Sequence, residues 1–138
     1  MYGVIMKISP FKIKAHRLKN VEFALNVNFE PGSKVDFRIS IDKQIEKHAD
    51  KPMAEVSIVV SIFKDMPEAP FMCRITYQGL FSWEEGIPSE NVEQYLKCNA
   101  AALLYSYVRP LVTQLTAMSN ITPLTLPFMN FTDEKEEE

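Results

Sequence analysis

Few residues in this chain of 138 could carry out chemistry, and their spacing matches no catalytic arrangement. His16 and His48 are far apart, and each lies among lysines, as exposed histidines without a ligand usually do. Glu84 and Glu85 are adjacent, whereas the two carboxylates of an acid–base pair usually converge from separate elements into one pocket. The serines and cysteines have no recognisable base, and the isolated glycines form no phosphate-binding loop. We therefore expect that the protein is not an enzyme and holds no cofactor.

The two cysteines predict a reducing compartment rather than a disulfide framework or a zinc site. Cys73 and Cys98 lie far apart, and neither belongs to a CxxC motif or has a histidine at ligand spacing. The first residues contain no apolar run behind a basic start, and no run reaches the roughly 18 apolar residues that would cross a bilayer. We expect a cytoplasmic protein without membrane insertion, whose natural start is either Met1 or Met6. The net charge of −3 argues against nucleic acid as a partner.

Alternating apolar and polar residues predict four β-strands in the first part of the chain. The alternation is clear in residues 21–29 and extends back to Phe11 after a slip near residues 18–20, which indicates a β-bulge. It recurs in residues 35–41, 54–63 and 71–78, with a polar connection over residues 43–52. The short connections favour antiparallel pairing of strands that are neighbours in sequence.

Apolar residues at helical spacing predict a short helix from residue 88 and a long one from residue 99. Pro110 removes a backbone hydrogen bond inside the long helix and is expected to kink it. The opposite face of this helix is small and nearly uncharged, which predicts contact with a second subunit; a helix that packs on its own sheet alone is the alternative.

These elements predict an α+β fold: a four-stranded antiparallel sheet with one long kinked helix packed on one face. We expect one domain over residues 1–131 and an acidic, disordered tail over residues 132–138.

Two motifs at matching positions in the chain give it a family resemblance. The first is Gln78-Gly79-Leu80-Phe81, at the end of the last expected strand. The second follows the long helix, where a loop with two prolines and alternating leucines closes on Asn130-Phe131. In this order the motifs resemble the SecB family, the tetrameric chaperones of bacterial protein export, in which the glycine motif forms a turn after the last strand. The resemblance spans roughly Pro10 to Phe131.

The resemblance implies a holdase, which keeps unfolded polypeptides soluble by reversible apolar contact without nucleotide or metal. In this family a crossover loop, the second strand and the Pro/Leu loop line a client groove. The corresponding residues here are Phe29, Val35, Phe37, Ile39, Leu124, Leu126 and Phe128. Core packing is the alternative role for each of them. For Val35 and Ile39, the sequence favours neither the groove nor the core.

The resemblance also implies a docking face for the translocase motor SecA, which export-type members build from acidic residues on the first and fourth strands. The matching positions hold Asn20, Glu22, Ala24, Met72 and Arg74. Only Glu22 is negative, and Arg74 would repel a basic partner. The helix that follows Asn-Phe in the family also lacks an apolar counterpart here. We therefore expect a specialised client, such as an antitoxin, ahead of general export through SecA.

The family assembly implies a homotetramer, a dimer of dimers in which protomers join sheets and the dimers pack helix to helix. The residues expected near the contacts between subunits are Cys73, Ile75, Tyr77, Ala101, Ala102, Arg109 and Thr113. Two other classes of function stay open. A structural or adaptor module of the same fold would bind one folded protein and suppress no aggregation. An enzyme would show a ligand-filled polar pocket.

Overall fold

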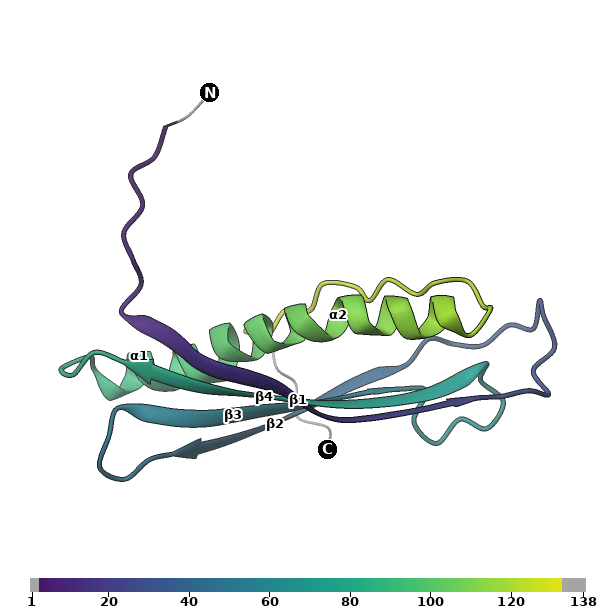
Figure 1. The fold of residues 1–138 in the computed structure, drawn as a ribbon, viewed down its shortest axis with the longest axis horizontal. Coiled ribbons are helices and arrows are strands. Elements are labelled where there is room, and N and C mark those ends of the chain that lie inside the picture. The colour runs from purple at the N-terminus through teal and green to yellow at the C-terminus, as the bar shows by residue number, and fades with distance from the viewer. Residues whose placement is uncertain (1–2, 133–138) are drawn as a thin grey trace.

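The computed structural model describes residues 3–132 and places the strands before the helices (Figure 1). The strands are β1 (Phe11–Leu25), β2 (Ile39–Lys47), β3 (Met53–Ile62) and β4 (Phe71–Trp83). The helical stretch consists of α1 (Ser89–Gln94), the π-helix η1 (Tyr95–Ala100) and α2 (Ala101–Met118). An antiparallel sheet beneath one long helix confirms the α+β class predicted from the sequence. The predicted acidic tail lies outside the described residues, except for Thr132.

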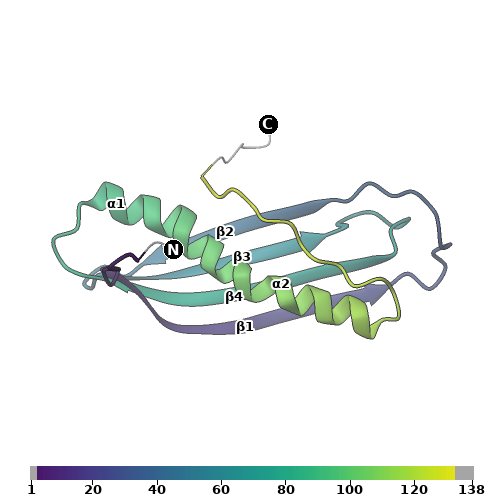
Figure 2. The same ribbon diagram turned by 90° about the horizontal axis from the view of Figure 1, so that it is seen from above.

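The strands are arranged in the order β1-β4-β3-β2, and all neighbours are antiparallel. Pairing of sequence neighbours is therefore correct for β2 with β3 and for β3 with β4, but wrong for β1 with β2. The connection over residues 26–38 crosses from one edge of the sheet to the other, as Figure 2 shows. That connection is long enough for the crossing, because three strand spacings amount to only about 14 Å.

Three strand boundaries differ from those predicted by alternation alone. β1 ends at Leu25 and not at residue 29. β2 begins at Ile39 and runs to Lys47, so the expected polar connection is largely strand. Ser40, Asp42, Gln44 and Glu46 face away from the helix, whereas Lys43 lies on the helix side and donates to the carbonyl of Lys97 at 2.8 Å. The isoleucines of β2 pair in register with β3, from Ile39 opposite Ile62 to Ile45 opposite Val56. Gly79 lies inside β4 and not in a turn after it, because β4 continues to Trp83 along both neighbours.

The bulge predicted in β1 is confirmed. The register of β1 against β4 shifts between Leu18 and Asn20, and it shifts a second time between Ile13 and Ala15. Each shift moves one extra residue into β1, which is an edge strand of the sheet. The apolar residues Ile13 and Phe23 consequently both face the helix, although the plain alternation between them is broken.

The helix predicted in two parts is one continuous stretch. The π-helix η1 joins α1 to α2 without a break, and π-helical turns of this kind are inserted into longer α-helices. α2 continues through Pro110, which lies on its exposed side. The kink expected at Pro110 stays a prediction.

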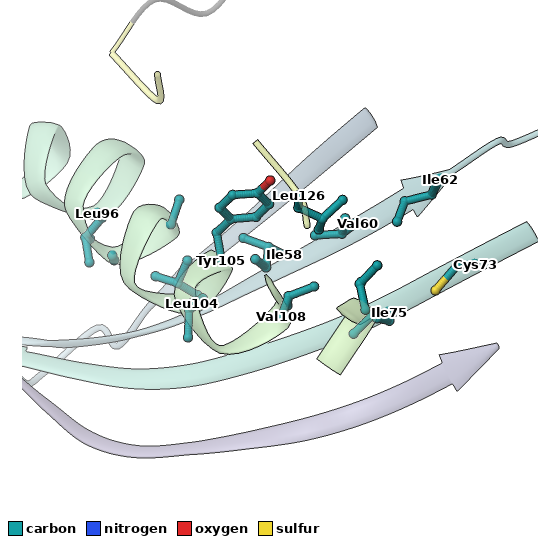
Figure 3. Close-up of a cluster of buried hydrophobic side chains, with 14 of the residues drawn as sticks. Ile58, Val60, Ile62, Cys73, Ile75, Leu96, Leu104, Tyr105, Val108 and Leu126 are labelled. Carbon is teal, nitrogen blue, oxygen red and sulfur yellow. The ribbon is translucent and has the colours of Figure 1, made fainter. Parts of the chain in front are cut away.

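The core lies between α2 and the two central strands (Figure 3). The five residues of β3 that face the helix are inaccessible to solvent: Ala54, Val56, Ile58, Val60 and Ile62. Leu104, Val108 and Val112 of α2 meet them from above. Cys73 of β4 belongs to the same core, and burial raises the pKa of its thiol to about 11.

Replacing Gly79 with alanine is expected to destabilise the fold, because β4 passes directly beneath α2 at this residue. A Cβ atom at Gly79 would lie 2.8 Å from Cε2 of Phe81 and 2.9 Å from Cδ2 of Leu104, and both side chains are fully buried. Overpacking of this kind costs about 1–3 kcal/mol of unfolding free energy. Urea denaturation should show that loss. Gly3→Ala is the control, since a Cβ there meets nothing within 4 Å, and equal midpoints for the two variants would contradict the packing described.

Candidate functional site

Reactive side chains do not gather anywhere in the described part of the chain. Residues 3–132 contain no cluster of His, Cys, Asp and Glu that could hold a metal ion. Nδ1 of His16 lies 2.6 Å from the hydroxyl oxygen of Tyr77, and the imidazole stacks on Tyr107. Glu84 and Glu85 remain adjacent in the loop after β4. No helix among these residues is long and apolar enough to span a membrane.

An open apolar pocket of about 500 Å³ lies at the end of the sheet where β1 finishes and β4 begins. Three separate segments form it: the crossover connection of residues 26–38, the β3–β4 hairpin, and the loop after α2. We call it the Phe pocket. Its lining residues are Phe29, Pro31, Gly32, Phe37, Phe63, Pro70, Phe71, Asn120, Ile121, Thr122 and Leu124.

Phenylalanines from separate segments form a chain of ring contacts along the wall of this pocket. The ring of Phe37 meets Phe63 edge to face at a centroid distance of 5.7 Å, and Phe63 meets Phe71 in the same way at 5.2 Å. Phe71 in turn stacks on Phe23 of β1 at 5.3 Å. Edge-to-face pairs of aromatic rings add stability beyond the area that they bury. The pocket therefore has an aromatic wall that links β1, β4 and the β3–β4 hairpin to the crossover.

Two residues of the Phe pocket adopt a left-handed backbone that side chains rarely accept. Phe63 has φ of 56° and Asn120 has φ of 58°. Asparagine tolerates this conformation just after a helix, but for phenylalanine it costs about 1–2 kcal/mol. The N–H of Phe63 donates to the carbonyl of Arg38 at 3.0 Å, and the ring lies between Phe37 and Phe71. These contacts hold the strained residue, and strain retained in this way is typical of functional sites.

Asn26 fixes the crossover connection against the β3–β4 hairpin. Its side-chain nitrogen donates to the carbonyls of Pro67 and Ala69 at 3.2 and 2.9 Å, and its backbone N–H donates to the carbonyl of Pro70 at 2.9 Å. One residue thus satisfies three carbonyls of the hairpin. The position of Phe29 and Phe37 relative to Phe63 depends on this attachment.

The residues after α2 run back along the helix as an extended segment, which we call the C-terminal segment (residues 123–131; Figure 2). Polar side chains on one face of α2 bind its backbone. Tyr105 donates to the carbonyl of Pro127 at 2.6 Å, Arg109 to that of Leu126 at 3.0 Å, and Thr113 to that of Leu124 at 2.8 Å. The N–H of Leu124 donates to the buried hydroxyl of Thr116 at 2.9 Å.

The far end of this segment is held where the helix begins. The thiol of Cys98 donates to the carbonyl of Phe131 at 3.2 Å, and the ammonium of Lys43 lies 5.9 Å from the centre of the Phe131 ring. Burial lowers the pKa of Lys43, and burial raises the pKa of Tyr105, which the nearby Arg109 partly offsets. None of these groups lines the Phe pocket, and no residue that does line it titrates.

The structure brings together three of the residues predicted for the groove and separates the others. Phe29, Phe37 and Leu124 line the Phe pocket. Leu126 is fully buried in the core, and Phe128 is 88% exposed, stacked under the guanidinium of Arg109. Two further predicted members, Val35 and Ile39, are half-buried and pack against the core.

Sequence reasoning missed Phe63, Phe71 and Ile121 as pocket residues. The two phenylalanines flank the β3–β4 hairpin, and alternation assigned them simply to the strands. The proline-rich hairpin between them was the available signal, since it turns the chain back and brings the two rings together.

The five residues predicted for the motor-docking face do share one surface. Asn20, Glu22 and Ala24 of β1 lie beside Met72 and Arg74 of β4 on the face of the sheet opposite the helix. Glu22 is directly opposite Arg74, and Ala24 is directly opposite Met72. Opposite charges at facing positions attract one another, so the patch presents little net charge.

The residues predicted for the subunit interface are placed differently. Cys73, Ile75 and Ala101 are buried in the core of the single chain, so the face that they form is already covered by its own helix or sheet. Arg109 and Thr113 bind the C-terminal segment, Tyr77 packs beside Tyr107, and Ala102 is exposed. Other apolar residues are exposed on the helix-facing side of β1 and at the end of α2, namely Leu18, Val21, Leu25 and Met118.

The structure is an antiparallel sheet covered by one helix, with an open apolar pocket formed by three loops at one end. Comparison with known proteins places it more closely. The family model of the preprotein translocase subunit SecB matches residues 9–134, so the chain belongs to the SecB family. Members of this family are chaperones and not enzymes.

Several individual relatives and one solved structure resemble this chain. An uncharacterized protein of Methanocaldococcus jannaschii is 31% identical over 123 residues, covering 86% of this chain and 78% of that protein. The protein-export protein SecB of Anaplasma marginale is 27% identical over 111 residues, and the match spans 80% of this chain but only 61% of that protein. A SecB-like chaperone of Mycobacterium tuberculosis, in complex with a ChAD peptide from the HigA1 antitoxin, shares the fold with a TM-score of 0.70. It is 20% identical, with 87% of this chain and 91% of that chain covered.

Thr116→Val is expected to loosen the C-terminal segment, because valine keeps the shape of threonine but cannot accept the hydrogen bond from Leu124. An amide left without its partner costs about 1–3 kcal/mol. Hydrogen exchange should become faster at the Leu124 amide, and urea denaturation should show the lost stability. Thr125→Val, at the exposed neighbouring position, is the control. Unchanged exchange at Leu124 would mean that the segment is held by other contacts.

Proposed function

We propose that this protein is a holdase, which binds unfolded or partly folded polypeptides through the Phe pocket and keeps them soluble in the cytosol. The observation that carries the proposal is the aromatic wall of Phe37, Phe63 and Phe71 around an open apolar pocket. Apolar contact has no directional requirement and therefore accepts many client sequences. Catalysis, nucleotide and metal play no part in this mechanism.

The edge of the sheet next to the pocket supports the same proposal. β2 pairs with β3 on one side only, and it starts two residues after Phe37. Its half-buried residues Ile39, Ile41 and Ile45 point toward the helix side. An extended client can add to such an edge through backbone hydrogen bonds while its side chains enter apolar pockets. We propose that a client continues from the Phe pocket along β2, which gives Val35 and Ile39 a place at the floor of the groove.

Within this function, we propose a dedicated client in preference to general export through SecA. The face of the sheet opposite the helix, which we call the bare face, carries Arg74 opposite Glu22. This pair of opposite charges offers little attraction to a basic motor segment. The related mycobacterial chaperone, seen with an antitoxin peptide, supports an antitoxin as one kind of client.

Phe37→Asp is expected to abolish most suppression of aggregation, because a carboxylate in the Phe pocket opposes apolar contact. Phe37 is 42% exposed, so the substitution should leave the fold intact. The measurement is light scattering by a chemically denatured enzyme diluted into buffer with and without the protein.

Phe128→Asp is the matched comparison, since Phe128 is exposed and lies outside the Phe pocket. We expect a smaller loss from it. Equal loss would extend the groove along the C-terminal segment, and full suppression by Phe37→Asp would remove the proposed pocket. If the unchanged protein suppresses no aggregation at all, the result favours the alternative function, an adaptor module that binds one folded protein.

We also propose a homotetramer, with sheets joined in dimers and two dimers packed through their helix layers. The apolar surface that supports it comprises Leu18, Val21 and Leu25 of β1 and Met118 of α2, together with the uncharged exposed residues Ala102 and Ser106. Exposed apolar residues that share one side of a strand are typical of contacts between proteins.

Leu18→Asp is expected to break this assembly, because it places a charge in the middle of the apolar surface. Multi-angle light scattering should report a smaller mass for the variant than for the unchanged protein. Leu80→Asp puts the same charge on the bare face of the sheet and should leave the mass unchanged. A monomeric mass for the unchanged protein would exclude the tetramer.

A further inference from the structure

The residues ahead of β1 form the most exposed apolar surface in the described chain. Val4, Ile5, Met6 and Ile8 are 71%, 97%, 82% and 92% exposed. In Figure 1 this stretch, residues 3–9, leaves the body of the molecule as an extended strand-like segment without helix or sheet partners. We call it the arm. The SecB family model begins at residue 9, so the arm lies ahead of the part that the family shares.

The arm has the properties of a ligand for an apolar groove. In an extended chain, successive side chains point to opposite sides, so Val4, Met6 and Ile8 form one apolar side. Lys7, the only charged residue in it, falls on the other side with Ile5. An extended segment with a continuous apolar side is the form of polypeptide that the Phe pocket is proposed to bind.

The arm cannot reach the Phe pocket of its own chain. It is attached at Phe11, which is opposite Trp83, whereas the pocket lies at the other end of β1, where Leu25 is opposite Phe71. Because of its two bulges, β1 is only as long as the thirteen paired residues of β4, which span about 40 Å at 3.3 Å each. The eight residues from Gly3 to Pro10 cover at most about 28 Å when fully extended. An arm in a Phe pocket must therefore come from another copy of the chain.

We propose that the arm of one copy occupies the Phe pocket of a second copy and competes there with clients. The inference rests on the proposed function in one respect, since it uses the same pocket. Arm and client exclude each other because both require contact with Phe37, Phe63 and Phe71. An unoccupied pocket is thereby protected from non-specific aggregation, and a client binds only when its apolar contacts exceed those of the arm.

The test uses a fluorescent synthetic peptide of residues 3–10 and two forms of the protein. One is the full chain, and the other starts at Ser9 behind an initiator methionine, which keeps the hydrogen bond that the N–H of Phe11 donates to the Ser9 hydroxyl. Fluorescence anisotropy should show one peptide bound per pocket of the arm-deleted form. The full chain should bind the peptide several-fold more weakly, because its own arms occupy the pockets. A peptide with Val4, Met6 and Ile8 changed to serine should not bind.

Two controls locate the binding and separate this inference from the proposed function. Phe37→Asp in the arm-deleted form should lose the peptide, while Phe128→Asp should keep it. The arm-deleted form should also bind a reduced and alkylated unfolded protein more tightly than the full chain does.

Retention of the peptide by Phe37→Asp, or equal affinity in both forms, would overturn the inference. Binding of the peptide to neutral lipid vesicles with no binding to the protein would overturn it as well. If the unfolded protein binds and the peptide does not, the inference fails and the proposed function stands; if neither binds, both fail.

Discussion

A single helix is narrower than the sheet that it covers, and the functional surfaces of this protein follow from that mismatch. A helix with its side chains is about 10 Å across, while the outer strands of a four-stranded sheet are about 14 Å apart with their own side chains beyond. α2 therefore packs against β3 and β4, whose inward residues are completely buried, and leaves β1 and β2 incompletely covered. The apolar residues on those two edge strands are therefore only partly buried, from half-buried Ile39 on β2 to exposed Leu18 on β1.

The two edges differ in how they are covered. On the β2 side, the C-terminal segment lies beside the helix and places Leu124 and Leu126 over the sheet. Its prolines at 123 and 127 lack N–H groups, and the carbonyls of Leu124, Leu126 and Pro127 are bound by α2. The segment thus needs no hydrogen bond from β2 and leaves that edge open. On the β1 side, Leu18, Val21 and Leu25 stay 45%, 36% and 42% exposed within residues 3–132, which is why a second subunit is proposed there.

The sequence was sufficient for the fold class because period-2 alternation and helical spacing report on burial directly. β3 lies within one residue of its predicted limits, and the bulge near Leu18 was visible as a break in phase. Alternation does not report which strand lies beside which, so the crossover that separates β1 from β2 could not be derived from it. It also shows that Cys73 and Ile75 face something apolar without showing whether that is their own helix or another subunit. For the same reason the Phe pocket was predicted only in part: it depends on three loops, and loop geometry is not periodic.

The strained conformation of Phe63 indicates how a pocket built only from apolar contact can still be specific in shape. A left-handed phenylalanine is retained only where surrounding contacts outweigh its cost, and here these contacts are the Arg38 carbonyl and two aromatic rings. Rings packed edge to face restrict one another, so under the proposed function such a wall would lose little side-chain entropy when a client binds. Clients would then be selected by how well their bulky residues fit a fixed aromatic wall. Selectivity of this kind needs no charged group, in agreement with a pocket whose lining contains none.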